Sequence, residues 1–241
     1  MIVTMSVSGK NGPLYLQIKK ILKDRILHGV YPIETNIPSE TLLESEFQVS
    51  KITVRNAIKE LVQEGYLEKK SGKGTKVIRN TSFSKLSKGK RFTEVLVEEK
   101  HKILKQLLQT EIVTNQEGTE PYRWFGEHCL RIERLYYLDD VPYIHYTHYL
   151  SEGMKATNTS DLSLQSLYEW IGEQGINLGK FRDEFAVGIA PSHVEDILSI
   201  NKGTPLLKRL RYSYDDTGNL IEYSEGYYNT EMQHYIVNYD V

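Results

Sequence analysis

The chain has 241 residues, of which 39% are hydrophobic and 26% are charged, enough for one large domain or two ordinary ones. Its formal net charge is −2, and its single cysteine, Cys129, excludes an intrachain disulfide and favours a reducing compartment. No apolar run approaches the roughly 20 residues of a membrane span. Residues 1–13 also lack the basic-then-apolar order of a signal peptide, so we expect a cytoplasmic protein with no membrane partner.

The first predicted elements are two short helices, and a short turn leads from the second of them into a third. Apolar residues recur at helical spacing in the first of them, which Gly29 ends: Leu14, Ile18, Ile21, Leu22 and Ile26. Ser39 and Ser50 are N-cap candidates for the second and third helices, because a serine hydroxyl accepts a free backbone N–H at a helix start. The three residues at 48–50 are few enough to hold these helices at the steep angle of a helix-turn-helix.

A third helix and a basic hairpin follow. The segment EKKSGKGTKVI predicts two short strands around Gly72 and Gly74, where glycine allows positive φ and a close backbone approach. Residues 51–80 hold 8 Lys and Arg against 3 Asp and Glu, whereas residues 81–241 hold 17 against 24. This order of elements, with its local positive charge, indicates a winged helix-turn-helix that binds duplex DNA.

The third helix separates into an apolar face and a polar face. Val54, Ile58, Leu61 and Val62 are predicted to face inward, with Tyr66 following them. Recognition helices touch base edges mainly with their N-terminal residues, which favours Lys51, Thr53 and Arg55 for that role. The alternative for each is an exposed residue that touches phosphate or nothing.

The second half is predicted to be rich in strands after a polar, basic linker at 79–91. Strands are expected at 128–137 and 141–150 around the turn Asp139–Asp140, at 181–190, and as a hairpin of 205–214 and 220–228, with a last edge at 235–239. Helices are expected at 163–173 and at 192–200, the latter opened by a capping box of Ser192 and Glu195. The order implies an antiparallel sheet with helices on one face, and an α+β fold overall.

The first domain resembles the DNA-binding head of the GntR family of bacterial transcriptional regulators. The matching segments are PLYLQIKKILKDRILHGVYP, IPSE, VSKITVRNAIKELVQEGYL and GKGTKV. The chain departs from the family at Thr41 and Lys51, where the family usually has arginine, so its operator preference is expected to differ. The predicted DNA-contacting set is Ser39, Glu40, Ser50, Lys51, Thr53, Arg55, Asn56, Lys59, Gly72, Lys73, Gly74, Thr75 and Lys76.

The second half resembles the UTRA effector domain, the partner of this head in the HutC subfamily. The matching pieces are RFTE, LRIERLYYLDDVPY, SLYEW and KGTPLLKRLRYSYDDTGNLIEYSEGYY. The resemblance implies a fold like that of chorismate lyase, domains at 1–78 (winged head), 79–91 (linker) and 92–241 (effector binding and dimerisation), and a small effector such as a sugar phosphate. It places the effector-binding residues at Phe92, Thr93, Arg134, Ser166, Tyr168, Lys180, Glu222 and Tyr228.

Two departures bear on the effector. Sugar-phosphate sensors often have a second arginine where this chain has Tyr136, and a glutamate where it has Tyr146. Fourteen of the 17 tyrosines follow residue 80, which reflects either the tyrosine preference of strands or a site that stacks a ring. For Arg134 the alternative is a structural role paired with Glu133 or Asp183.

The leading hypothesis is therefore a ligand-responsive transcriptional repressor, a homodimer that is released from operator DNA by its effector. The alternatives are a lyase-like enzyme fused to a DNA-binding head, and an effector-independent DNA-binding protein. We expect no catalytic residue, cofactor or metal. His145 and His148 are three apart on a strand and point to opposite faces, which makes them a poor metal pair.

Overall fold

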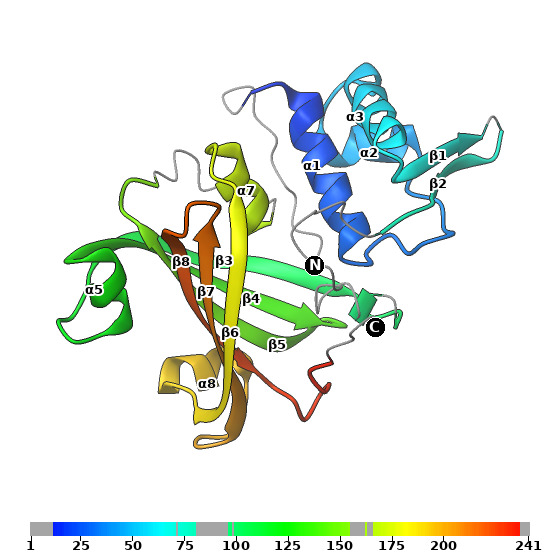
Figure 1. Cartoon of the computed structure of the whole chain (residues 1–241). Helices are drawn as coiled ribbons and strands as arrows, with labels where there is room; N and C mark the ends of the chain where they lie inside the picture. Colours follow the sequence, from blue (N-terminus) through cyan, green and yellow to red (C-terminus); the bar gives the residue numbers. More distant parts are fainter. Residues whose placement is uncertain are drawn as a thin grey trace, which may run out of the picture. The chain divides into compact units, whose positions relative to one another are not determined.

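The computed structural model describes residues 12–70, 72–80, 96–97, 99–154, 162 and 166–236, and these fall into two compact units. The first unit contains the N-terminal helices and the hairpin, together with the described residues at 96–102, and the second contains the long strands from residue 103 onward (Figure 1). Most of the predicted linker lies outside the described residues. Of its described residues, Arg79 donates to the Glu64 carbonyl at 2.6 Å and packs on the Tyr66 ring, within the first unit.

The first unit is a three-helix head with a two-stranded wing. Its elements are α1 (Leu14–Leu27), α2 (Glu40–Phe47), α3 (Lys51–Gln63), β1 (Leu67–Lys70) and β2 (Gly74–Val77). The predicted apolar stripe of α1 packs against the buried face of α3, which is formed by Val54, Ala57, Ile58 and Leu61. Ion pairs from Lys19 and Lys23 to Glu64, at 2.5 and 3.2 Å, also join α1 to the end of α3.

The second unit is a six-stranded antiparallel sheet in the order β3-β4-β5-β8-β7-β6. Its strands are β3 (Ile103–Thr114), β4 (His128–Leu138), β5 (Val141–Ser151), β6 (Leu178–Ile189), β7 (Pro205–Asp215) and β8 (Leu220–Tyr228). In the described part of this unit the helices are α5 (Glu120–Phe125), α7 (Leu167–Glu173) and α8 (Ser192–Leu198). The predicted strands and both hairpins are confirmed. The strand β3 and the helix α5 were not predicted, and the expected last edge lies mostly outside the described residues.

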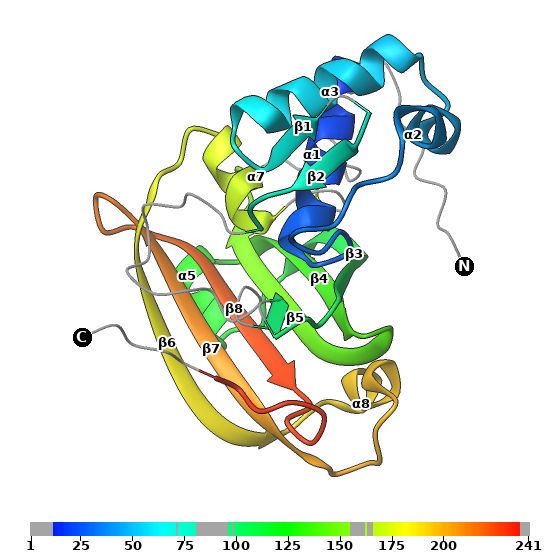
Figure 2. The ribbon, with the colours of Figure 1, turned by 90° about the vertical axis from the view of Figure 1, so that its right-hand side faces the viewer.

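The helices cover both faces of this sheet, so the prediction that they share one face is wrong. α7 packs on Leu130 and Ile132 of β4, whereas α8 packs on Leu135 of the same strand. Side chains alternate between the two faces of a strand, so these two helices lie on opposite faces. They also lie at opposite ends of the sheet in both views (Figures 1 and 2).

The start of α8 also differs from its prediction. Pro191 is the N-cap residue, Ser192 is the first helical residue, and no side-chain cap bond forms. The Glu195 carboxylate instead accepts a hydrogen bond from the backbone N–H of Gly203 at 2.6 Å. Proline fixes φ near the helical value at a helix entry, so the capping box is not used.

Candidate functional site

The recognition helix α3 begins as the sequence predicts. Ser50 caps it by accepting the Thr53 backbone N–H at 3.3 Å, and Ser39 caps α2 by accepting the Leu42 N–H at the same distance. Gln48 adopts a left-handed conformation with φ of 53° at the end of α2. The two caps and this sharp bend set the angle between the helices.

Glu40 holds one predicted DNA-contacting cation, Arg55, and one further cation of the wing, Lys69. Its carboxylate accepts a hydrogen bond from Arg55 Nε at 2.7 Å and one from Lys69 Nζ at 2.6 Å. The hydrogen bond from Lys69, followed by that from Arg55, keeps the pKa of Glu40 below its usual value despite partial burial. The Arg55 side chain remains 56% exposed. Glu40 therefore orients the outward side chains of the recognition helix and of the wing.

The two positions at which the sequence departs from the GntR pattern are neighbours. Lys51 Nζ donates to Thr41 Oγ1 at 3.4 Å. The adjacent Ile52 is 67% exposed at the start of α3, and Leu42 is 63% exposed on α2. Neither residue was singled out from the sequence. An exposed apolar side chain at the front of a recognition helix can contact a thymine methyl group.

The wing is a tight hairpin whose tip is tied to the head. Gly72 and Gly74 have φ of 72° and 92°, which side chains rarely adopt. Asn36 Nδ2 donates to the Lys73 carbonyl at 3.1 Å, and a Cβ at Gly74 would lie 3.2 Å from the same amide nitrogen. Asn36 was not singled out from the sequence, because the link between α1 and α2 has no pattern that marks it.

The remaining predicted head residues differ in their exposure. Asn56 and Lys59 are exposed on α3. Thr75 is only 8% exposed, so the structure gives no support to its predicted phosphate contact. Lys76 pairs with Glu34, which it must leave to reach a phosphate.

In the second unit, polar side chains from four strands gather on the face that α7 covers. We call it the inner face and define it by Arg134 of β4, His148 of β5, Glu222 of β8, and Arg209 and Arg211 of β7. Cross-strand pairing places them together: Arg134 lies opposite Tyr146, which lies opposite Gly226, which lies opposite Arg209. His148, Ser224, Arg211 and Asp183 form the next row. Of the predicted effector residues, Arg134, Glu222 and Tyr228 lie on this face.

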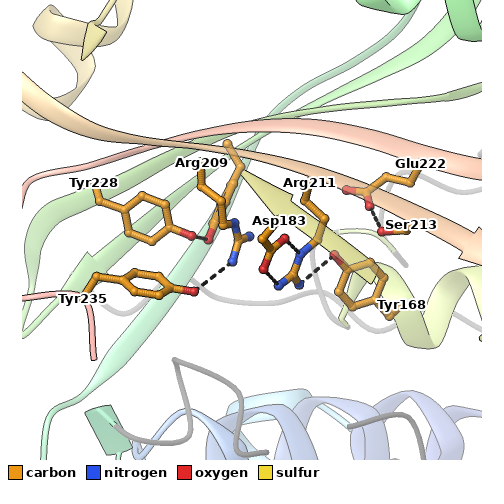
Figure 3. A network of polar contacts seen from close by, with 9 residues as sticks. Tyr168, Asp183, Arg209, Arg211, Ser213, Glu222, Tyr228 and Tyr235 are labelled. Carbon is orange, nitrogen blue, oxygen red and sulfur yellow. Dashed lines mark hydrogen bonds and ion pairs between the residues drawn. The ribbon is translucent and has the colours of Figure 1, made fainter. Parts of the chain in front are cut away.

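Glu222 is a fully buried carboxylate with its own hydrogen-bond partners. It accepts a hydrogen bond from Ser213 Oγ (Figure 3). The Nδ1 atom of His148 lies 2.8 Å from its Oε1 atom. Burial alone would raise its pKa, but the hydrogen bonds from His148, Ser213 and Ser224 outweigh burial and lower it. A carboxylate only accepts, so His148 carries its proton on Nδ1. Burial also lowers the pKa of His148, which leaves its Nε2 atom as a buried acceptor without a hydrogen-bond partner among the described residues.

Arg134 lies almost entirely buried, 1% exposed, and donates from Nη2 to the Leu162 carbonyl at 2.7 Å. A purely structural role for Arg134 was expected to pair it with Glu133 or Asp183, but each of these carboxylates has another cationic partner. Glu133 lies 3.5 Å from Arg131, and Asp183 binds Arg211 through two hydrogen bonds of 2.6 Å. Sequence reasoning missed the Arg211–Asp183 pair because it joins two strands 28 residues apart in the chain.

Aromatic side chains surround Arg209, which was also missed. Its guanidinium carbon lies 5.2 Å from the centre of the Tyr146 ring and 5.5 Å from that of Tyr228. The hydroxyl groups of these two tyrosines are hydrogen-bonded to each other. Arg209 Nη1 also makes a long contact of 3.4 Å to Tyr235 Oη (Figure 3).

The other predicted effector residues differ in whether they lie near the inner face. Ser166 is the N-cap residue of α7 without a side-chain cap bond, and Tyr168 Oη accepts from Arg211 Nη1 at 3.3 Å. Lys180 is exposed and lies over the Tyr214 ring, so the structure does not bring it to this group. Phe92 and Thr93 lie outside the described residues.

The histidines behave as predicted. His148 contacts Glu222 on the inner face, whereas His145 lies on the other face, 3.7 Å from Glu133. Within the described ranges, no cluster of three His, Cys, Asp or Glu side chains could hold a metal ion, and no helix is long and apolar enough to cross a membrane.

A capped recognition helix and a basic wing on one unit, with a buried polar face on the other, define a DNA-binding transcription regulator. The comparisons agree: residues 14–77 match bacterial regulatory proteins of the gntR family, and residues 104–234 match the UTRA domain. The chain belongs to the UTRA family and carries a GntR-type head.

Similar proteins support both halves. The chain is 26% identical to the transcriptional repressor NagR of Bacillus subtilis and 23% identical to the mannosyl-D-glycerate system repressor MngR of Escherichia coli, over more than 90% of each chain. The crystal structure of PhnF from Mycobacterium smegmatis has the same fold, with a TM-score of 0.53, 23% identity, and coverage of 92% of this chain and 99% of that one. A B. subtilis regulator, YurK, matches at 48% identity over 68 residues only, so that the match covers 28% of its length.

Proposed function

We propose that the protein is a cytoplasmic, homodimeric repressor of the HutC type that leaves its operator when a small anionic effector binds to the inner face. The observation that carries the proposal is the convergence of Arg134, Glu222 and Tyr228 on one buried face of a sheet joined to a DNA-binding head. A sugar phosphate is the leading effector, since MngR is named for a mannosyl-D-glycerate system and other relatives for fructoselysine utilisation. The relatives are named as regulators, and we propose binding without turnover.

The effector arm of the proposal is tested on Arg134. A charge-assisted hydrogen bond to a desolvated anion contributes about 1.5–3 kcal/mol, so Arg134→Ala should weaken effector binding about ten- to a hundredfold. A thermal-shift screen of sugar phosphates and related metabolites finds the ligand, because one that binds only the folded state raises the melting temperature. Calorimetry then compares wild type and variant, and recovery of the ligand tests for turnover. A folded variant with unchanged affinity contradicts the assignment.

The DNA arm separates specificity from affinity. Arg55 and Lys51 stand at the front of α3, where base-edge donors discriminate sequences by roughly 1–3 kcal/mol each. Lys73 and Lys76 lie on the wing, where phosphate contacts weaken all duplexes alike and flatten the salt dependence. Competition between an operator selected from random duplexes and a scrambled one decides between them. Equal weakening of both duplexes by Arg55→Ala shows that Arg55 does not read bases.

The proposed dimer is supported by one of the two edges of the sheet, the one formed by β6. β6 is an edge strand, and Phe185, Val187 and Ile189 alternate along one of its faces with exposures of 47%, 79% and 55%. An edge with exposed apolar residues is suited to pairing, and a two-fold axis brings the same patch of both copies together. Light scattering on the full chain should therefore give a dimer, and Val187→Lys should shift it toward monomer, whereas Ile112→Lys on β3 should not. A wild-type monomer at micromolar concentration contradicts the proposal.

A further inference from the structure

Within the residues that the structure describes, Arg209 is a buried cation without an acidic partner. It is 7% exposed, and no carboxylate in the described part of the chain forms an ion pair with it. Its Nε atom has no hydrogen-bond partner there, and the hydrogen bond from its Nη1 atom to Tyr235 Oη is long, at 3.4 Å. Arg211, two residues on along the same strand and face, has Asp183 for its charge. The two arginines are therefore in different electrostatic situations.

The surrounding tyrosines compensate the Arg209 charge only in part. Their ring faces attract a cation, but burial raises the pKa of both Tyr146 and Tyr228, so neither supplies a negative charge at neutral pH. A guanidinium stays protonated at any physiological pH. Removing it from water is costly unless another charge or a full set of hydrogen bonds replaces the lost hydration. An anion beside Arg209 would supply both.

The register places this cation in line with the proposed effector site. Arg134, Tyr146, Gly226 and Arg209 are successive partners across four strands, which are about 4.8 Å apart. Gly226 carries no side chain, and the Tyr146 ring occupies the space above it: a Cβ there would lie 2.4 Å from Tyr146 Cε1. The ring of Tyr146 therefore lies between the two arginine positions, and its contact with Arg209 depends on the glycine.

We propose that Arg209 is a second anion-binding residue of the effector site, and that it selects an organic anion whose phosphate or carboxylate group binds its guanidinium beside the rings of Tyr146 and Tyr228. The planar fork of donors fits either group. The inference rests on the proposed function, which makes the inner face the effector site. Arg209 would also supply a cationic contact from β7 in a chain that has Tyr136 on β4 where sugar-phosphate sensors often have an arginine.

The test uses the full-length protein and its own fluorescence. Both tryptophans, Trp124 and Trp170, lie in the second unit, so their emission follows the thermal unfolding of that unit and not of the head. Inorganic phosphate and acetate are titrated at constant ionic strength. At about five times its dissociation constant, a bound anion should raise the wild-type melting temperature by roughly 2–4 °C. A larger shift with phosphate indicates a phosphate group on the effector, and a larger shift with acetate indicates a carboxylate.

Matched variants locate the anion. Arg209→Met should lose the shift, and in the absence of anions it should melt at the wild-type temperature or above, because replacing an uncompensated buried charge by an apolar side chain is often neutral or stabilising. Arg182→Met removes an arginine whose side chain is 63% exposed on β6, and should keep the shift. No shift in the wild type, or an equal shift in Arg209→Met, overturns the inference. If Arg209→Met does not fold, Arg209→Lys decides: it keeps the charge without the fork and should show a smaller shift, and an unchanged shift overturns the inference.

Arg134→Ala separates this inference from the function on which it rests. If Arg134→Ala loses the shift and Arg209→Met keeps it, the role of Arg209 is wrong and the effector site stands. If the shift survives both substitutions, the anion binds elsewhere, and the effector site assigned to the inner face is wrong as well.

Discussion

Gly226 is the position at which the smallest change should disturb the inner face most. A Cβ added there would lie 2.4 and 2.8 Å from two carbons of the Tyr146 ring and 3.2 Å from a carbon of the Tyr228 ring. The Tyr146 ring is not free to retreat, because its hydroxyl is bonded to Tyr228 and because the rings of Tyr136 (T-shaped) and His148 (stacked) pack against it at centroid distances of 5.3 and 5.4 Å. Gly226→Ala must therefore displace a packed ring.

The two opposing free energies can be compared. Replacing a strand glycine by alanine stabilises by about 0.5–1 kcal/mol through the lost freedom of the unfolded chain, whereas overpacking a filled interior costs about 1–3 kcal/mol. We expect a net loss of about 1–2 kcal/mol, which lowers the melting temperature by roughly 2–8 °C. Tryptophan fluorescence of the full chain measures it.

Two controls make the result specific. Gly172→Ala, in α7 with open space around its position, should stabilise slightly instead. In a Tyr146→Ala background the two shortest contacts are absent, so Gly226→Ala should destabilise much less, which gives a coupling energy of about 1 kcal/mol or more. If Gly226→Ala melts at or above the wild-type temperature, the account of the ring above the glycine is wrong.

Three further outcomes are expected. Glu40→Gln should release Arg55 and Lys69, raise the affinity for any duplex and lower the ratio of operator affinity to scrambled-duplex affinity several-fold. An unchanged ratio in competition binding would contradict the orienting role of Glu40. Burial, with smaller contributions from nearby cationic groups, lowers the pKa of His145 from 6.5 to about 4. As the pH falls, the unfolded state therefore binds a proton first, and roughly 3 kcal/mol of stability should be lost between about pH 6.5 and about pH 4. Urea unfolding should show this loss in the wild type but not in His145→Gln, and an identical pH dependence in both would refute the account. Cys129 is fully buried, donates to an amide oxygen at 3.0 Å and has its pKa raised by burial, so thiol reagents should label it only on unfolding, and rapid labelling of the native protein would exclude that packing.

Local signals carried most of the head. Ser39 and Ser50 predict two helix starts, and Gly72 and Gly74 predict the wing, because each of these residues acts on the backbone next to it. The strand β3 gives no such signal: it is an edge strand whose partly exposed residues do not alternate cleanly. The six residues of α5 are too few for a helical period to show.

The site was less predictable than the fold. Asp183, Arg209 and Glu222 come from three strands and share one face only because of the sheet register, which depends on long-range pairing. The family resemblance supplied Glu222 but not Arg209, which has no motif of its own. The sequence also could not predict which face each of α7 and α8 covers, because β4 carries apolar residues on both of its faces.

The alternation along these strands has a consequence for how such a regulator diverges. On β7, Arg209 and Arg211 point to the inner face, whereas Leu206, on the other face, packs in the cluster under α8. If the inner face binds the effector as we propose, a substitution at an inner position changes which molecule is recognised and leaves the packing under α8 intact. Ligand preference can then change one residue at a time while the packing on the other face of the sheet stays the same. Recognition and packing can thus change independently within one sheet.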